Sequence, residues 1–533
     1  MSLVFETASP LAQADRHRAD VACFIGFVAR RAGRPLPAAL RAQLTVAGWL
    51  DGIWARPAKQ IESLENLPIT LDSWDLFDQL FAWEARPLKE SEAATCATYM
   101  GAAVRSFLAR GGRRAIVIRV GDPWPFLESG ARRATLRRTR LRRMLPDFAD
   151  RGAPEAPFEP YNPASWQGIH HLYGLRENSM LILPDLADAC TFEPPKPEVI
   201  LAPPALPEGF VECSSDEPVE PDSSLRNLPA PRLDSRGYAA WQLAVSAARA
   251  FLAQHQREVQ LVAALPLPDL DTRRVSGAGH IHAQADMLAY LQRIGVLRED
   301  GSVGGSDQGV ASAFVQLAWP WLRTRVSADL PEGLESPDGV LAGLIAAGSA
   351  LRGSFRSVAG NFSMPRLRDV VDAEPVPSWG LGVDSPTEKL ARHICVIAQS
   401  PDGWALQSDV TTSSQEAWRF GGASRLLGTI VRAARAAGDS VAFGLNGPAL
   451  WAQLRRTIDD MLMEFWLEGA FAGATVADAF SVRCDRSTMT QNDLDNGRLI
   501  VEITVRPAVS IERIIVVLNL GNTAASSTVR ELA

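Results

Sequence analysis

Residues Thr98 to Val120 read TYMGAAVRSFLARGGRRAIVIRV, and this stretch contains the clearest structural signal in the chain. Apolar side chains recur every three or four residues in its first half, which predicts a helix over Thr98 to Ala109. The pair Gly111-Gly112 would end that helix, and Ala115 to Val120 predicts a buried strand. A helix, a glycine pair and a strand in this order indicate an α/β layer.

The length and composition describe a protein of several domains. With 533 residues the chain is too long for one ordinary core, and domains of about 100 to 200 residues predict roughly three. No run approaches the ~20 uncharged residues of a membrane span, and Met1 to Asp20 lacks the organisation of a secretory signal. We therefore expect synthesis in the cytoplasm and no direct membrane insertion.

The net charge of -7 gives no overall attraction to nucleic acid. A local exception is a run of arginines that would make a helix basic almost all round: Arg132, Arg133, Arg137, Arg138, Arg140, Arg142 and Arg143. No aromatic residue is interleaved for base stacking. The run is therefore expected to pair with acidic surface on a neighbouring subunit or to stay solvated, and no nucleic acid is expected as a partner.

The motifs of catalysis and cofactor binding are missing from the sequence. It contains neither of the glycine-rich loops that hold phosphates and dinucleotides, no zinc-binding helix motif and no nucleophile turn. His170-His171 and His280-Ile281-His282 lack a third ligand at usable spacing. The cysteines are scattered and are expected to be free thiols. We predict no catalytic, cofactor-binding or metal site.

The chain changes character along its length. Residues 194–231 are rich in proline and acidic residues, which predicts an exposed loop or linker. Helices are expected over Ser424 to Ala436 and Pro448 to Leu467, the second with a continuous apolar stripe. Strands are expected at the following segments: Ala391 to Ala398, Ala479 to Cys484, Leu499 to Val505 and Ile514 to Leu518. The fold class is α+β, with mixed α/β layers in several domains.

The C-terminal region resembles the C-terminal domain of contractile tail sheath proteins. The matching residues are Leu450-Trp451, Phe465 to Gly473, Ala479 to Asp485, Thr490 to Leu499 and Arg506 to Glu512. Two upstream regions are similar to the same family, Thr98 to Arg119 and Ala313 to Trp321 with Ser336 to Gly339. The resemblance therefore samples much of the chain, with a weaker match over about 125 to 235.

This resemblance implies an inner core domain formed by the N- and C-terminal parts, with outward-facing material inserted in the middle. The expected divisions are an arm over 1–20, core over 21–124, the middle over 125–384, core again over 385–510, and a last strand with a C-terminal arm over 511–533. Sheath subunits of this family stack as six-fold rings around an inner tube protein, with baseplate and terminal cap proteins at the ends. No cofactor is implied.

Terminal arms in this family add strands to the sheets of neighbouring subunits, through main-chain hydrogen bonds. The expected arm residues are Leu3, Val4 and Phe5 at the start and Ile514, Val516 and Leu518 near the end.

A second expectation concerns the helix Ser424 to Ala436, because a helix in this region contacts the tube in sheaths. At about 100° per residue, Arg425, Arg432 and Arg435 fall on one side, which we expect to face the tube or to remain solvated. The opposite side is expected to dock and contains Leu427, Ile430, Val431 and Ala434.

Both halves of the core lie in one polypeptide, which favours a phage tail or a phage-like injection particle, assembled in the cytoplasm and possibly released, over a two-chain secretion sheath. Two other classes stay open at this point. One is a sheath-like cap or baseplate accessory that does not contract. The other is an α/β enzyme with an unfamiliar active site.

Overall fold

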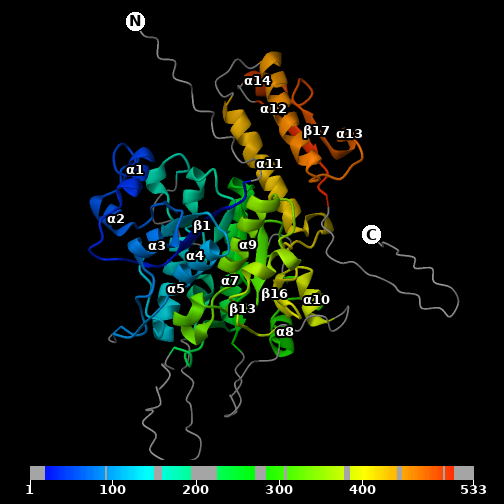
Figure 1. Ribbon diagram of the computed structural model, residues 1–533. Helices are drawn as coiled ribbons and strands as arrows, with labels where there is room; N and C mark the ends of the chain where they lie inside the picture. Colours follow the sequence, from blue (N-terminus) through cyan, green and yellow to red (C-terminus); the bar gives the residue numbers. More distant parts are fainter. Residues whose placement is uncertain are drawn as a thin grey trace, which may run out of the picture. The chain divides into compact units, whose positions relative to one another are not determined.

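The computed structural model divides into two compact units, Met1–Leu445 and Asn446–Ala533 (Figure 1). The structure describes residues 18–90, 93–148, 159–193, 225–269, 284–304, 309–376, 385–440, 447–495 and 499–508. Both units combine helices with strands. The expectation of an α+β protein in more than one unit is therefore confirmed.

An eight-stranded mixed sheet forms the centre of the first unit. Its central strands run parallel to one another, and each edge strand is antiparallel to its neighbour. In spatial order they are β16 (Gly403–Leu406), β15 (Cys395–Ser400), β12 (Val315–Trp319), β10 (Gln260–Ala264), β8 (Met180–Ile182), β1 (Val21–Gly26), β7 (Arg114–Arg119) and β3 (Ile69–Leu71).

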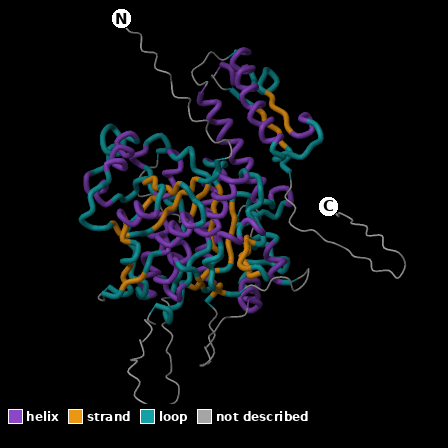
Figure 2. The backbone as a smooth tube through the Cα atoms, in the orientation of Figure 1, coloured by secondary structure: helices purple, strands orange, loops and turns teal. Residues whose placement is uncertain are grey.

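Helices surround this sheet (Figure 2). Strands β1, β8, β10 and β12 are buried at every residue, as expected for parallel strands covered on both faces. The helices of this unit are α1 (Ala38–Val46), α2 (Ala58–Ser63), α3 (Trp74–Leu80), α4 (Tyr99–Ala109), α5 (Gly130–Met144), α6 (Leu186–Cys190), α7 (Ser235–His255), α8 (Gln284–Arg293), α9 (Asp338–Arg352), α10 (Pro386–Ala391) and α11 (Gly421–Ser440). No helix in the described part of the chain is long and apolar enough to cross a membrane.

Short strand pairs connect these elements at the margins of the first unit. They are β2 (Ala29–Arg30) with β4 (Phe81–Ala82), β5 (Arg86–Pro87) with β6 (Thr95–Cys96), β9 (Arg232–Leu233) with β11 (Leu267–Pro268), and β13 (Trp321–Arg323) with β14 (Asp372–Glu374).

The stretch Thr98 to Val120 forms the predicted helix and strand, as α4 and β7. The hydroxyl of Thr98 accepts a hydrogen bond from the backbone N–H of Gly101 at 3.2 Å, which caps the helix. Gly111 then adopts a φ of 108°, a backbone conformation that favours glycine at the helix end. Strand β7 follows directly and pairs with β1 along its whole length.

Glycines let helices α4 and α9 pack closely. A Cβ atom added at Gly339 would lie 2.5 Å from the carbonyl oxygen of Ala103, and one at Gly343 would lie 2.8 Å from that of Phe107. Both distances are too short for a carbon atom, so the crossing of the two helices requires glycine at these positions. The sequence resemblance included Gly339 without giving it this role.

The second unit contains α12 (Pro448–Leu467), α13 (Val476–Ala479), β17 (Phe480–Arg483), α14 (Gln491–Asp495) and β18 (Glu502–Val505). The apolar stripe of α12 is buried as predicted, at Trp451, Leu454, Ile458, Met461, Leu462 and Phe465. Gly469, with a φ of 82°, turns the chain after the helix. Between the two strands the chain forms the short helix α14.

The structure corrects the expected division of the chain. Strands from 21–124, 125–384 and 385–510 all belong to the same sheet, so the middle is not a separate domain from the core around it. The boundary between compact units falls at 445/446 and not at 384/385. Of the proline-rich stretch, residues 225–231 are described, and Leu228 and Ala230 are buried in the first unit.

We predict that Gly339→Ala destabilises the protein, because its Cβ atom would collide with the backbone of α4. Overpacking of this kind costs about 1–3 kcal/mol. The matched control is Gly438→Ala in α11, where nothing lies within 4 Å of the added atom. The control should gain up to about 1 kcal/mol from helix propensity. Urea unfolding measures both, and equal effects of the two variants would contradict the tight crossing.

Candidate functional site

The second unit presents a small antiparallel sheet with open edges. Strand β17 pairs with β18, and among the described residues no third strand joins them. The register sets Phe480 opposite Val505 and Val482 opposite Ile503. The sheet packs beside α12 through Phe471, whose ring lies 6.3 Å from that of Phe465 in α12 and 5.9 Å from that of Phe480 in β17.

The hydrogen-bonding pattern identifies which main-chain groups point outward. The backbone N–H of Arg506 donates to the carbonyl of Ala479 at 2.9 Å, so hydrogen-bonded pairs alternate from that position along the ladder. The N–H and C=O groups of Val482 therefore point away from β18, and those of Ile503 point away from β17. Each strand offers a free edge of the kind that accepts an additional strand.

The predicted arms at Leu3, Val4 and Phe5 and at Ile514, Val516 and Leu518 lie outside the described residues. The open edges of β17 and β18 are candidate acceptor sites that the sequence analysis did not single out. The signal for them in the sequence was the alternation of apolar and polar residues in FSVR and EITV, typical of a sheet with one covered face.

The second candidate surface is helix α11, and here the structure departs from the expected orientation at Arg425 and Val431. Of the residues expected on the docking side, Ile430 is buried and Leu427 and Ala434 are half-buried, but Val431 is 37% exposed and Arg425 is buried beside Leu426 and Ile430. The expectation that Arg425 lies on the free side of the helix is therefore wrong.

Arg425 is held by two charged hydrogen bonds. Its Nη1 lies 2.9 Å from one oxygen of Asp409 and its Nη2 lies 2.6 Å from the other, and its Nε donates to the carbonyl of Ser354 at 3.1 Å. Burial would raise the pKa of Asp409, but the guanidinium of Arg425 overcomes this and the pKa is lowered.

Arg432 and Arg435 lie further along α11 and contact Glu258. Arg432 donates to the backbone carbonyl of Glu258 at 2.7 Å and to that of Arg18 at 2.9 Å, and burial lowers its pKa to about 10. Arg435 forms an ion pair with the carboxylate of Glu258 and keeps 44% of its side chain exposed. Of the three arginines, Arg435 is the one that leaves substantial surface for a partner.

Glycines let helix α11 approach Asp409 and Glu258 closely. Cβ atoms added at Gly421 and Gly428 would lie 2.3 Å from Oδ1 of Asp409 and 2.8 Å from the carbonyl of Glu258. The helix therefore lies directly against two buried acidic residues, and only long cationic side chains can neutralise them. The residues Gly421, Gly422 and Gly428 were the signal in the sequence that could have indicated a buried arginine face.

Two members of the arginine run, Arg133 and Arg140, are also buried within the subunit. In α5, Arg133 lies 3.1 Å from Oδ1 of Asp188, while Arg86 from β5 lies 2.6 Å from its other oxygen. Arg140 lies 2.7 Å from Glu128. The expectation that the run meets a neighbouring subunit or stays solvated is therefore wrong for Arg133 and Arg140.

The sheet has a topological switch point beside β1. From β1 the chain builds β3 and β7 on one side, then crosses to β8 on the other side and continues outward. Ligands of open α/β sheets bind in the crevice at such a point. Here Asp185 fills it: its Oδ2 accepts a hydrogen bond from the N–H of Phe27 at 2.7 Å, and burial raises its pKa to about 7.

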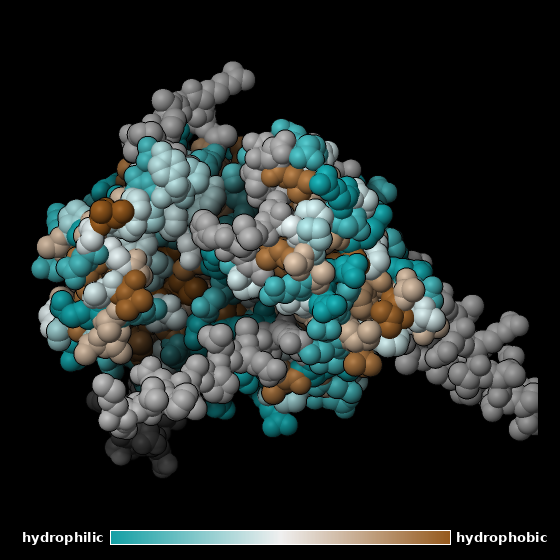
Figure 3. Space-filling view, turned by 90° about the horizontal axis from the view of Figure 1, so that it is seen from above, coloured by the Kyte–Doolittle hydropathy of each residue, from teal (hydrophilic) through white to brown (hydrophobic). Residues whose placement is uncertain are grey.

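Metal ligands, cysteines and apolar surface patches provide no further candidate site among the described residues. Among the described residues no group of three or more His, Cys, Asp or Glu could hold a metal ion. The five described cysteines are buried free thiols, as expected. Apolar residues on the face in Figure 3 form separate patches among hydrophilic ones.

Comparison with solved structures identifies the fold. No family model matches the sequence, and a search of curated proteins finds no match. A chain from the contracted baseplate of the anti-feeding prophage aligns with a TM-score of 0.55 at 16% identity, covering 98% of this chain and 100% of that one. A chain from the contracted helical sheath of the same particle aligns at 0.51 and 17%, covering 98% and 99%. The expected sheath fold is confirmed over nearly the whole chain.

We predict that Arg425→Ala lowers the free energy of unfolding by about 3–5 kcal/mol, because it leaves the buried carboxylate of Asp409 unpaired. Arg176→Ala is the matched control, since both side chains of its ion pair with Asp439 of α11 are more than half exposed and its loss should cost at most about 1 kcal/mol. Urea titration measures both. A loss for Arg425→Ala no larger than that of the control would show that Asp409 does not depend on this partner.

The same pair predicts a pH dependence. Because the folded pKa of Asp409 is lowered, its stabilising contribution is present above the ordinary pKa of an aspartate, about 4, and is lost as the pH falls below it. The difference in unfolding free energy between the wild type and Asp409→Asn should therefore shrink from pH 6 to pH 3, within the range where the protein stays folded. A constant difference would contradict this assignment.

Proposed function

We propose that this chain is the sheath subunit of a contractile, phage-like injection particle. It would assemble as stacked six-membered rings around an inner tube and contract to drive the tube through a target envelope. The observation that carries this proposal is a shared fold over 98% of the chain with a protein of a helical sheath. The open edges of β17 and β18 add a route to polymerisation that is independent of the comparison.

In this proposal the arms named in the sequence donate strands to the open edges on neighbouring subunits. Strand addition uses main-chain hydrogen bonds, so it tolerates variation of side chains and can persist while the rest of the subunit rotates. Contraction then exchanges one packing of rigid units for another of lower free energy and needs no cofactor. Assembly in the cytoplasm and contacts with tube, baseplate and cap proteins belong to the same proposal.

Two further features support a structural role. The switch point of the sheet, where an enzyme of this architecture would bind its ligand, is filled by the buried side chains of Asp185, Asp188 and Arg86. On α11, Arg435 remains a candidate contact to the tube, because 44% of its side chain is exposed beside the ion pair with Glu258.

A baseplate or cap accessory is the second candidate. It is favoured by the fact that two of the matched chains come from structures of a baseplate, with TM-scores of 0.52 and 0.55. Such a subunit would form one ring and stop, because it would lack a partner for the next layer.

We expect the purified chain, mixed with an inner tube protein from the same genome, to form striated cylinders in negative-stain electron microscopy. Single rings without stacking would favour the accessory role. Discrete particles under all conditions that polymerise the tube would overturn both assignments.

We further predict that Val482→Pro and Ile503→Pro abolish cylinder formation but leave the monomer folded. Each removes a main-chain N–H that points outward from the small sheet, so the internal ladder survives. Ser481→Pro is the control, because the N–H of Ser481 points toward β18 and its loss should destabilise the second unit itself. Circular dichroism reports folding, and microscopy reports assembly. Normal cylinders from both edge variants would contradict strand addition at these edges.

A further inference from the structure

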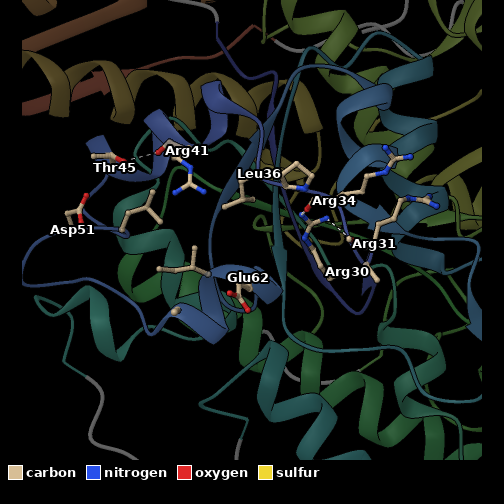
Figure 4. Close-up of a pocket in the computed structure, with 14 residues that line it drawn as sticks. Arg30, Arg31, Arg34, Leu36, Arg41, Thr45, Asp51 and Glu62 are labelled. Atoms are coloured by element: carbon tan, nitrogen blue, oxygen red, sulfur yellow. Dashed lines mark hydrogen bonds between the residues drawn. The ribbon is translucent and has the colours of Figure 1, made fainter.

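A groove on the first unit lies between the loop after β2 and the helices α1 and α2 (Figure 4). Its volume is about 830 Å³. In Figure 4, Arg30, Arg31 and Arg34 lie on one side, Arg41 on the other and Leu36 between them. The groove takes no part in the sheet, the ion-pair network or the strand edges described above.

The positive charge of this groove is mostly not neutralised. Arg31 is paired with Asp78 and Glu84, but Arg30 donates only to backbone carbonyls, including that of Arg34 at 2.7 Å. Burial and the neighbouring Arg119 lower the pKa of Arg30, and its Nε is buried without a hydrogen-bond partner.

Arg34 and Arg41 are exposed, and within the described ranges neither forms an ion pair. The lining contains two carboxylates, on Asp51 and Glu62. The guanidinium groups of Arg30, Arg34 and Arg41, which form no ion pair among the described residues, outnumber the two carboxylates of the lining by one, and this excess of positive charge favours an acidic segment.

Apolar surface accompanies the charge. Leu36, Leu50 and Ile61 line the groove and pack against the main core from its surface. Val46 at the end of α1 and Ile53 between α1 and α2 are 90% and 83% exposed. An extended peptide with both acidic and apolar side chains would find partners for each.

We infer that this groove binds the acidic, proline-rich segment of a second copy of the chain. Residues 212–222 contain acidic side chains and no basic ones, with prolines at 218 and 221. The acidic residues are Glu212, Asp216, Glu217, Glu220 and Asp222. The terminal segments outside the described residues, 1–17 and 509–533, carry nearly balanced charge, so charge complementarity selects this segment.

Proline supports this choice, since proline-rich segments lose less conformational entropy on binding in an extended form. The stacked assembly would place a second copy next to the groove, so this inference rests on the proposed function for the presence of that copy. The recognition of an acidic peptide by the groove does not depend on the proposed function. The segment leaves the described structure after Glu193, beside Phe192, whose ring lies under Arg137 of α5 and Arg236 of α7, and not beside α1 or α2.

The test uses a fluorescent peptide of residues 208–224 and the full-length chain in which the five acidic residues are changed to Gln or Asn. This neutralised chain cannot occupy its own groove. We expect saturable binding by fluorescence anisotropy that weakens with added salt. The double variant Arg34→Glu with Arg41→Glu should weaken binding by about tenfold or more.

The matched control is Arg257→Glu, a charge reversal at an exposed residue whose side chain, within the described part of the chain, hydrogen-bonds to the carbonyl of Ala253. It should leave the affinity unchanged. Absence of saturable binding, or equal binding to the groove variant and the control, would overturn the inference. So would equal binding of a peptide in which the same five residues are neutral.

Comparison with the wild-type chain, diluted until it is monomeric, decides the source of the segment. If a second copy is the natural partner, the wild-type monomer binds the peptide as well as the neutralised chain does. Much weaker binding to the wild-type monomer would place its own segment in the groove and overturn the proposal of a second copy.

The two proposals fail separately. The peptide measurement needs no cylinder, so its failure alongside normal striated cylinders removes the groove assignment and leaves the sheath. Failure to form cylinders alongside specific peptide binding removes the sheath function and leaves an acidic-peptide groove on this fold.

Discussion

The carboxylate of Asp188 is shared by two buried guanidinium groups, and much of the first unit depends on this interaction. Arg86 comes from β5, Arg133 from α5 and Asp188 from α6, and each is about 2% exposed or less. A charge buried without a partner costs several kcal/mol, so the three segments must meet. This requirement joins the N-terminal part of the chain to its middle beside the switch point of the sheet. A domain boundary near residue 124 is therefore excluded.

The same rule governs helix α11. Glycines bring its backbone against Asp409 and Glu258, and the arginines of the helix neutralise these acids instead of facing outward. These buried arginines are therefore not available for contacts between subunits, and such contacts must use other surfaces. In the second unit, the unpaired edges of β17 and β18 could bind a neighbouring chain through main-chain hydrogen bonds. On the first unit, the groove beside Arg41, with its excess of positive charge, could select a segment by its side chains. A contractile lattice would use both properties, since main-chain pairing withstands rearrangement and charge complementarity sets which segment docks where.

Local elements could be predicted from the sequence because neighbouring residues decide them. The helix and strand of Thr98 to Val120, the apolar stripe of α12 and the strand at Phe480 all follow from periodicity and glycine placement. The resemblance along the C-terminal region led to the sheath fold, which the solved structures confirm at 17% identity or less. The orientation of α11 was predicted wrongly because amphipathicity assigns every arginine to solvent, and it contains no information about a buried acid from another part of the chain.

By itself, then, the sequence determined the mixed α and β elements, the absence of recognisable catalytic motifs and the similarity to the sheath fold. All three depend on patterns within short segments. The tertiary structure alone decided that one sheet unites three quarters of the chain, that Arg133 and Arg425 are buried, and that the groove beside Arg41 keeps unneutralised charge. The physical reason is that the fate of a charged side chain depends on the partners that folding brings to it from distant parts of the chain.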